Sequence, residues 1–205
     1  TCALPISFDP IHNGHLAAAQ SAVDVFAADE VYFVPSFSPP HKQDQQITSP
    51  FHRYAMVTLA TQPFPKFRPS TIELDALKKR YTVETLEILG NQHPEAQILF
   101  IIGTDMYLEI DSWKDYRRLL DLAHLVVVNR PGFALRNDVA PVTTVSTVQL
   151  ISPAPRKSVY YLPFVNLPVS STQIRERAQQ GEDIRQWLPE SVWRYIDTHK
   201  LYSNQ

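Results

Sequence analysis

The sequence has few of the features that mark secreted, membrane or nucleic-acid-binding proteins. Only one of its 205 residues is cysteine, so no internal disulfide can form, which is consistent with a cytoplasmic protein. The formal net charge of −2 gives no global electrostatic reason to expect binding to nucleic acid or an anionic membrane. No apolar run approaches the ~20 residues that span a bilayer, and the start lacks the charged-then-apolar pattern of a signal peptide.

The overall composition and length of the chain are typical of a globular domain. Hydrophobic residues make up 44% of the chain and charged residues 20%, and the length suffices for one sizeable core. Continuous apolar runs such as Glu30–Pro35, Gln97–Gly103 and His124–Val128 predict buried parallel strands, and helix-like segments alternate with them. We therefore expect an α/β fold, a Rossmann-like doubly wound and mostly parallel sheet with helices on both faces, in a single domain over residues 1–205.

The stretch Ser7–His15, SFDPIHNGH, precedes the helix-like run LAAAQSAVDVF. A helix start offers unpaired N–H groups and partial positive charge, which suits phosphate, and Gly14 lets a ligand approach the backbone. His12 and His15 add donors that titrate near pH 7. A pair of histidines three apart is also common on surfaces and in satisfied cores, whereas a zinc site lacks further ligands because Cys2 is the only cysteine.

A second motif, VSSTQIRER over Val169–Arg177, also precedes a predicted helix. The hydroxyls of Ser171 and Thr172 suit either phosphate binding or capping of that helix. Arg175 follows by one turn, and its guanidinium can form a forked contact with phosphate oxygens.

Together the two stretches resemble the nucleotidyltransferase superfamily that carries an HxGH loop and an ISSTxIR loop, and within it the bacterial nicotinate-nucleotide adenylyltransferases. The resemblance extends over nearly the whole chain. Further similar pieces are PPHK at Pro39–Lys42, YTVETL at Tyr81–Leu86, IIGTD at Ile101–Asp105, Trp113, VVVNRPG at Val126–Gly132 and the ending LPESVWRYIDTHKLY.

This resemblance implies transfer of the adenylyl group from ATP to nicotinate mononucleotide, with release of nicotinate adenine dinucleotide and pyrophosphate in NAD biosynthesis. Mg²⁺ is expected to bind mainly through the ATP phosphates, without a dedicated protein site. The alternatives are a nicotinamide-mononucleotide or pantetheine-phosphate adenylyltransferase, or a nucleotide-binding protein without catalysis. No nucleic acid or membrane partner is expected, and the sequence is compatible with a homo-oligomer.

The resemblance also implies roles for individual residues. The catalytic contacts fall to His12, His15 and Arg175. The expected ATP-binding residues are Ser7, Phe8, Gly14, Gly103, Asp105, Ser171 and Thr172. The expected mononucleotide-binding residues are Lys42, Thr82, Trp113 and Arg130.

Several of these residues have an ordinary structural alternative. Asp105 and Thr82 could serve only as helix N-caps, and Trp113 could be a half-buried packing residue. Lys42 and Arg130 could be solvated surface cations.

The first six residues depart from the family pattern, which has a strand followed by Gly-Gly before SFDP; here Pro5 and Ile6 stand at the glycine positions. We hypothesise that Thr1–Ile6 is not natural sequence, because TCALPI translates ACG TGT GCT CTT CCG ATC, the end of a common sequencing adapter. If the residues are genuine, Pro5 lacks an N–H and Ile6 resists positive φ, which would compromise the phosphate-facing turn.

Resequencing the source DNA tests this hypothesis. We expect the natural reading frame to diverge from the present sequence before Ser7. An intact frame that encodes Pro5 and Ile6 would contradict it.

Overall fold

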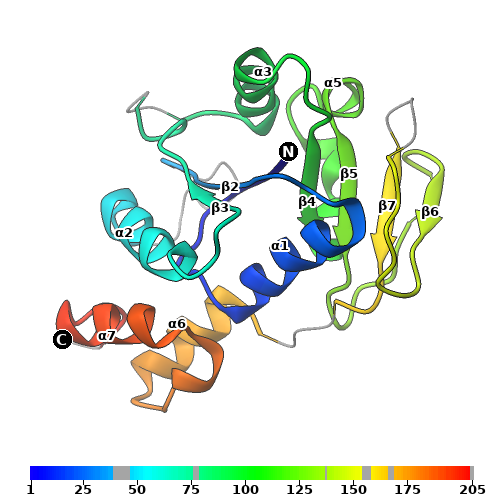
Figure 1. The fold of residues 1–205 in the computed structure, drawn as a ribbon. Helices are drawn as coiled ribbons and strands as arrows, with labels where there is room; N and C mark the ends of the chain where they lie inside the picture. Colours follow the sequence, from blue (N-terminus) through cyan, green and yellow to red (C-terminus); the bar gives the residue numbers. More distant parts are fainter. Residues whose placement is uncertain (39–46, 76–78, 137, 154–157, 166–168, 204–205) are drawn as a thin grey trace. The chain divides into compact units, whose positions relative to one another are not determined.

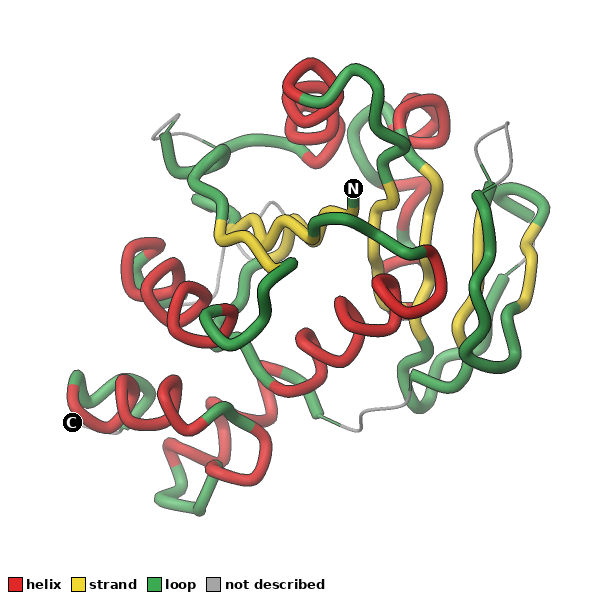
Figure 2. Tube along the Cα trace, viewed as in Figure 1, coloured by secondary structure: helices red, strands yellow, loops and turns green. Residues whose placement is uncertain are grey.

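The computed structural model describes residues 1–38, 47–75, 79–136, 138–153, 158–165 and 169–203. Strands and helices alternate along the chain, as Figure 2 shows along the Cα trace. The strands are β1 (Cys2–Ile6), β2 (Val31–Pro35), β3 (Phe67–Pro69), β4 (Leu99–Gly103), β5 (His124–Val128), β6 (Val142–Thr144) and β7 (Val159–Leu162). The α-helices are α1 (Asn13–Phe26), α2 (Pro50–Thr61), α3 (Thr82–Gln92), α4 (Thr104–Leu108), α5 (Tyr116–Leu122), α6 (Ser171–Gln179) and α7 (Glu190–Thr198). Two 3₁₀ turns are η1 (Ile110–Ser112) and η2 (Arg185–Trp187).

The seven strands of the described residues form one sheet with the order β3-β2-β1-β4-β5-β7-β6. The β1–β4, β4–β5, β5–β7 and β6–β7 pairings are parallel. The order runs from β1 outward to β3 and resumes at β4 on the other side of β1, which is the reversal that defines a doubly wound sheet. The predicted Rossmann-like, mostly parallel α/β fold is confirmed.

The chain divides into two compact units. Unit 1 comprises Thr1–Leu4, Ala17–Tyr32 and Tyr81–Pro168, and unit 2 comprises Pro5–Leu16, Phe33–Arg80 and Val169–Gln205. Each unit draws on segments that are far apart in sequence. The expectation of a single domain over residues 1–205 stays a prediction.

Unit 1 is built around the paired strands β4 and β5, which run in register from Leu99 beside His124 to Gly103 beside Val128. Nearly every residue of both strands is buried, in keeping with continuous apolar runs covered on both faces. Helices α3 and α5 pack against each other in this unit (Figure 1).

In unit 2, helix α2 packs against α7 and β3. Helix α7 buries Val192 and Ile196, as its amphipathic pattern predicts. Helix α2 buries Arg53, Met56, Val57 and Ala60, which share one face at helical spacing. A charged side chain therefore lies in the apolar stripe of α2.

The sequence Phe67–Leu74, with Ile72 and Leu74, predicts a strand, but this prediction is wrong beyond its third residue. Strand β3 ends at Pro69, and the chain then turns, with the Leu74 N–H donating to the Thr71 carbonyl at 2.7 Å. Proline offers no N–H to a sheet ladder, and β3 is an edge strand where such an ending is tolerated.

Strand β1 lies within Thr1–Ile6, the segment for which we hypothesise a non-natural origin. Its residue Cys2 pairs with Leu99 of β4. The Cys2 side chain is fully buried, and burial raises the pKa of its thiol to about 12. The thiol therefore stays protonated and unreactive near neutral pH. The non-natural origin of Thr1–Ile6 stays a prediction.

Among the described residues, none of the helices combines the length and the apolar composition needed to cross a bilayer.

Candidate phosphate-binding site

The first signature loop forms two reciprocal helix caps at the start of α1. His12 precedes the helix, and its Nδ1 accepts a hydrogen bond from the Gly14 N–H at 3.1 Å. In return, Nδ1 of His15 accepts one from the His12 N–H at 3.2 Å. This resembles a capping box, with imidazoles where a hydroxyl and a carboxylate usually stand. The spacing of three residues is therefore the spacing that reciprocal capping requires.

The two caps also determine which ring nitrogen can donate. Because each Nδ1 accepts a backbone hydrogen bond, the neutral ring carries its proton on Nε2. The His12 and His15 rings stack with centroids 3.7 Å apart and an interplanar angle of 23°. One nitrogen of each ring therefore caps the helix, and in the neutral ring the other nitrogen is a donor of the kind that phosphate oxygens accept.

Fewer backbone N–H groups are unpaired at this helix start than the sequence predicts. The Gly14 N–H is used by the His12 cap, and the His15 N–H donates to the His12 carbonyl at 3.0 Å. The imidazoles, and not the backbone amides, are therefore the main donors that this loop can offer an anion.

In the second signature loop, the capping role belongs to Ser170. Its hydroxyl accepts from the Gln173 N–H, and the Gln173 side chain accepts from the Ser170 N–H, which completes a capping box for α6. The structural alternative of capping by Ser171 or Thr172 is therefore wrong. Ser171 Oγ instead donates to the Pro10 carbonyl at 2.9 Å.

The two signature loops meet within unit 2. The Arg175 guanidinium donates through one terminal nitrogen to the Asp9 carbonyl at 2.7 Å and contacts Thr172 Oγ1 at 3.4 Å. A hydrogen bond from a charged donor contributes roughly 1.5–3 kcal/mol, against about 0.5–1.5 kcal/mol for a neutral one such as that of Ser171. The Arg175–Asp9 bond is therefore the stronger of the two links that join these loops.

The Asp9 side chain is buried at this junction and binds two further segments of unit 2. It is 1% exposed, and its carboxylate accepts from the Tyr202 hydroxyl at 2.7 Å and from the Thr48 N–H at 3.4 Å. Burial, and next the Asp9 charge, hold the pKa of Tyr202 well above its ordinary value of 10, so the phenol stays a donor at physiological pH. Arg175 lies 3.9 Å from the same carboxylate.

Residues predicted at the ends of β4 and β5 lie in unit 1. Gly103, rather than Asp105, is the N-cap residue of α4, and Asp105 forms an ion pair with Arg130 at 3.2 Å. Thr104 Oγ1 joins the two strand ends, because it accepts from the Arg130 N–H and donates to the Val128 carbonyl. The N-cap alternative for Asp105 is therefore wrong, and the Arg130 side chain is a partly exposed cation paired with Asp105.

The Asp105 carboxylate leaves one oxygen for a further donor. Its Oδ1 is buried and has no hydrogen-bond partner among the described residues. A Cβ added to Gly103 would lie 2.5 Å from this oxygen, so a side chain at this position would displace the Asp105 carboxylate. An acceptor of this kind suits a hydroxyl-bearing ligand.

The remaining predicted residues of unit 1 flank helices α3 and α5. Thr82 is the first residue of α3 and not its cap, since the Glu84 carboxylate accepts from the N–H of Tyr81, one residue earlier. Trp113 follows η1 and is half-buried, with its ring 6.1 Å from that of Phe100. Lys42 lies outside the described residues.

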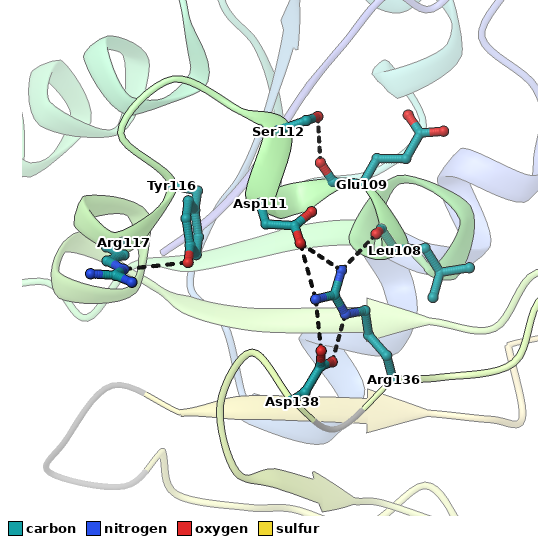
Figure 3. A network of polar contacts seen from close by, with 8 residues as sticks. All are labelled: Leu108, Glu109, Asp111, Ser112, Tyr116, Arg117, Arg136 and Asp138. Atoms are coloured by element: carbon teal, nitrogen blue, oxygen red, sulfur yellow. Dashed lines mark hydrogen bonds and ion pairs between the residues drawn. The ribbon is translucent and has the colours of Figure 1, made fainter.

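Arg136 fixes the segment that leads to Trp113. Its guanidinium binds the Leu108 carbonyl and the Asp111 and Asp138 carboxylates (Figure 3). Hydrogen bonds to the two carboxylates raise the pKa of Arg136, and the same contact lowers the pKa of Asp138. These groups are exposed, so the network orients the segment more than it stabilises the fold.

No group of three potential metal ligands occurs among the described residues. The one carboxylate at the loop junction, Asp9, is already bound by Tyr202 and Thr48. The other side chains there are imidazole, hydroxyl and guanidinium donors, which suit phosphate oxygens better than a cation.

Comparison with known proteins gives the family. Residues 5–177 match the sequence model described as cytidylyltransferase-like. The chain belongs to this cytidylyltransferase-like family. A relative from Frankia alni, named probable nicotinate-nucleotide adenylyltransferase, is 39% identical over 97% of this chain and 98% of its own. A relative of the same name from Kineococcus radiotolerans is 40% identical over 96% of this chain and 88% of its own. The resemblance drawn from the motifs is confirmed.

A solved structure supports the fold assignment for this cytidylyltransferase-like chain. It is Plasmodium falciparum nicotinic acid mononucleotide adenylyltransferase complexed with NaAD, with a TM-score of 0.75 and 21% identity over 98% of this chain and 96% of that one. At this identity the likeness shows the fold alone.

Sequence reasoning missed Asp9, Arg53 and Tyr202 as parts of this region. A signal for Arg53 was present, because it shares the spacing of the apolar residues Met56, Val57 and Ala60 on α2. Tyr202 has no such signal, since its partner Asp9 is 193 positions away.

The caps lead to a prediction about stability. We expect His12→Ala to lower the free energy of unfolding by about 1 kcal/mol, because the Gly14 N–H loses its acceptor. We expect His12→Asn to retain most of it, because an asparagine side-chain oxygen is a preferred N-cap acceptor. Urea unfolding of both variants measures the difference, and equal stabilities of the two would contradict the capping role.

Proposed function

We propose that this protein transfers the adenylyl group of ATP to nicotinate mononucleotide, giving nicotinate adenine dinucleotide and pyrophosphate. The observation that carries the proposal is the junction of the two signature loops in unit 2, where Ser171 and Arg175 donate to the carbonyls of Pro10 and Asp9 in the loop that also carries His12 and His15. The names of the relatives point to the same reaction.

The chemistry requires one bond to form and one to break at the α-phosphorus of ATP. A 5′-phosphate oxygen of the mononucleotide attacks in line, and the oxygen that bridges the α- and β-phosphates leaves with pyrophosphate. The nucleophile is already an anion, so no general base and no covalent enzyme intermediate are needed. Catalysis then comes from positioning the reactants and from neutralising charge on the transferring and leaving groups.

We assign these tasks to the donors of unit 2. His12 and His15 would contact the transferring phosphate through Nε2–H, the nitrogen that the caps leave as the donor. Arg175, Ser171 and Thr172 would hold the β- and γ-phosphates. The contact of Arg175 with the Asp9 carbonyl supports this role, because it fixes one edge of the guanidinium at the first loop. Ser7, Phe8 and Gly14 would complete the phosphate-binding loop.

Mg²⁺ would arrive with ATP, as part of the substrate, and would neutralise phosphate charge. The donor-rich, carboxylate-poor character of the loop junction supports this assignment. Asp105 and Gly103 are proposed for ATP, with the buried Asp105 Oδ1 suited to a ribose hydroxyl. Lys42, Thr82, Trp113 and Arg130 are proposed for the mononucleotide.

The choice of nicotinate over nicotinamide, the cytoplasmic location, the absence of nucleic acid and membrane partners, and the oligomeric state stay predictions.

A panel of acceptor substrates tests the reaction. We expect pyrophosphate release from ATP to be fastest with nicotinate mononucleotide, slower with nicotinamide mononucleotide and absent with phosphopantetheine. Release measured by a coupled phosphate assay distinguishes the three. A preference for phosphopantetheine, or no release with any acceptor, would contradict the proposal, and ATP binding without release would favour a non-catalytic nucleotide-binding protein.

Two histidine variants test the proposed roles of the rings. We expect His15→Ala to lower kcat/KM by about 10²–10³, the usual effect of losing one well-placed donor. We expect a comparable loss for His12→Asn, because asparagine supplies the capping oxygen but not the Nε2–H donor. The matched control is His52→Ala, whose ring contacts Tyr195 in the same unit and is expected to leave turnover unchanged. Near-normal turnover by folded His15→Ala would refute the assignment.

A further inference from the structure

Arg53 is a buried arginine that the proposed reaction does not use. It lies on α2 and is 1% exposed. Among the described residues it has no carboxylate within ion-pair distance, and its guanidinium is satisfied by carbonyl oxygens instead. Burial lowers the pKa of Arg53 below its ordinary value, a shift that the acidic groups Asp9, Tyr202 and Glu73 oppose. A buried cation that persists without an ion pair calls for a specific role.

The carbonyls that Arg53 contacts come from three separate backbone segments. Its guanidinium donates to Ser7 at 2.5 Å, to Ser36 at 2.6 Å, to Phe37 at 3.2 Å and to Thr48 at 2.9 Å. Ser36 and Phe37 follow β2, and Thr48 lies two residues before α2. Ser7 begins the first signature loop, so one side chain ties that loop to the backbone around it.

The contact at Ser7 precedes a strained residue. Phe8 has φ of +50°, in the left-handed region that a bulky side chain rarely adopts, and it is 1% exposed. The carbonyl before it is held by Arg53, and the carbonyl after it, that of Asp9, is held by Arg175. Two guanidinium groups therefore hold the backbone on either side of the strained residue.

The Phe8 ring connects this turn to the candidate catalytic histidines. Its edge faces the His15 ring with centroids 5.1 Å apart and an interplanar angle of 79°. The His15 ring also stacks with the His12 ring and accepts the His12 N–H through its Nδ1. A change in the Phe8 backbone would therefore move the group that orients His15.

We propose that Arg53 is a positioning residue of the candidate phosphate site. By holding the Ser7 carbonyl, it fixes the left-handed turn at Phe8, and through the Phe8 ring it sets the orientation of His15. This inference rests on the proposed adenylyl transfer for its kinetic consequence, but its structural consequence can be measured separately.

The kinetic test uses Arg53→Ala, Arg53→Lys and the matched control Arg68→Ala. Arg68 also donates to main-chain carbonyls of unit 2 but is more exposed. For folded Arg53→Ala we expect kcat to fall at least tenfold, while KM for ATP changes less than threefold, because His15 remains present but misplaced. Millimolar guanidinium chloride should restore activity at least threefold, whereas equal sodium chloride should not, and Arg68→Ala should behave as wild type. A kcat within twofold of wild type, or a loss without guanidinium rescue, would overturn the proposal.

The structural test separates a failure of this inference from a failure of the proposed function. Hydrogen exchange of the His12 and Gly14 amides, both bound to imidazoles, reports the loop directly. The variant used is Arg53→Lys, which retains the charge and therefore serves also if the alanine variant does not fold. In this variant we expect both amides to exchange at least tenfold faster than in wild type, while the exchange of the α7 amides is unchanged. If wild type shows no adenylyl transfer, faster exchange still supports the positioning role, and unchanged exchange rejects it.

Discussion

The hydrogen bond between the Arg175 guanidinium and the Asp9 carbonyl is the contact on which the functional account depends. It joins two loops that are 166 positions apart in sequence, and it does so with a charged donor inside a partly buried junction. Together with the Ser171–Pro10 hydrogen bond, it brings the loop that carries the imidazoles against the loop that carries the guanidinium. With it, donors from both signatures can act on a single anionic ligand.

The histidine pair shows how one side chain can meet a structural and a chemical requirement together. Each ring has two nitrogens, and a backbone N–H occupies the same one, Nδ1, in His12 and in His15. The cap thus sets the tautomer that phosphate binding needs, so the folding of α1 and the chemistry of its first turn are coupled. An ordinary capping residue such as serine would stabilise the helix without offering the second donor.

Much of the fold could be predicted from sequence because it depends on local pattern. The apolar runs of β4 and β5 predict buried parallel strands, and β5 begins and ends where its apolar run does. The pairing of the HNGH and SSTQIR motifs also predicted the family. Helix caps were less predictable, because Ser170 and Tyr81 differ from the expected residues by one position, which periodicity does not resolve.

The supporting residues could not be found in the same way, because their roles arise from contacts between distant segments. The spacing of Arg53 with the apolar residues of α2 indicates that it is buried, but it does not indicate its carbonyl partners, and Tyr202 looks like part of a loose chain end.

A crystal structure of the protein with a non-hydrolysable ATP analogue is the most direct test of the central claim. The account predicts phosphate oxygens within hydrogen-bonding distance of Nε2 of His12 or His15 on one side and of the Arg175 guanidinium on the other. A triphosphate bound away from both loops, or contacted by only one of them, would contradict it.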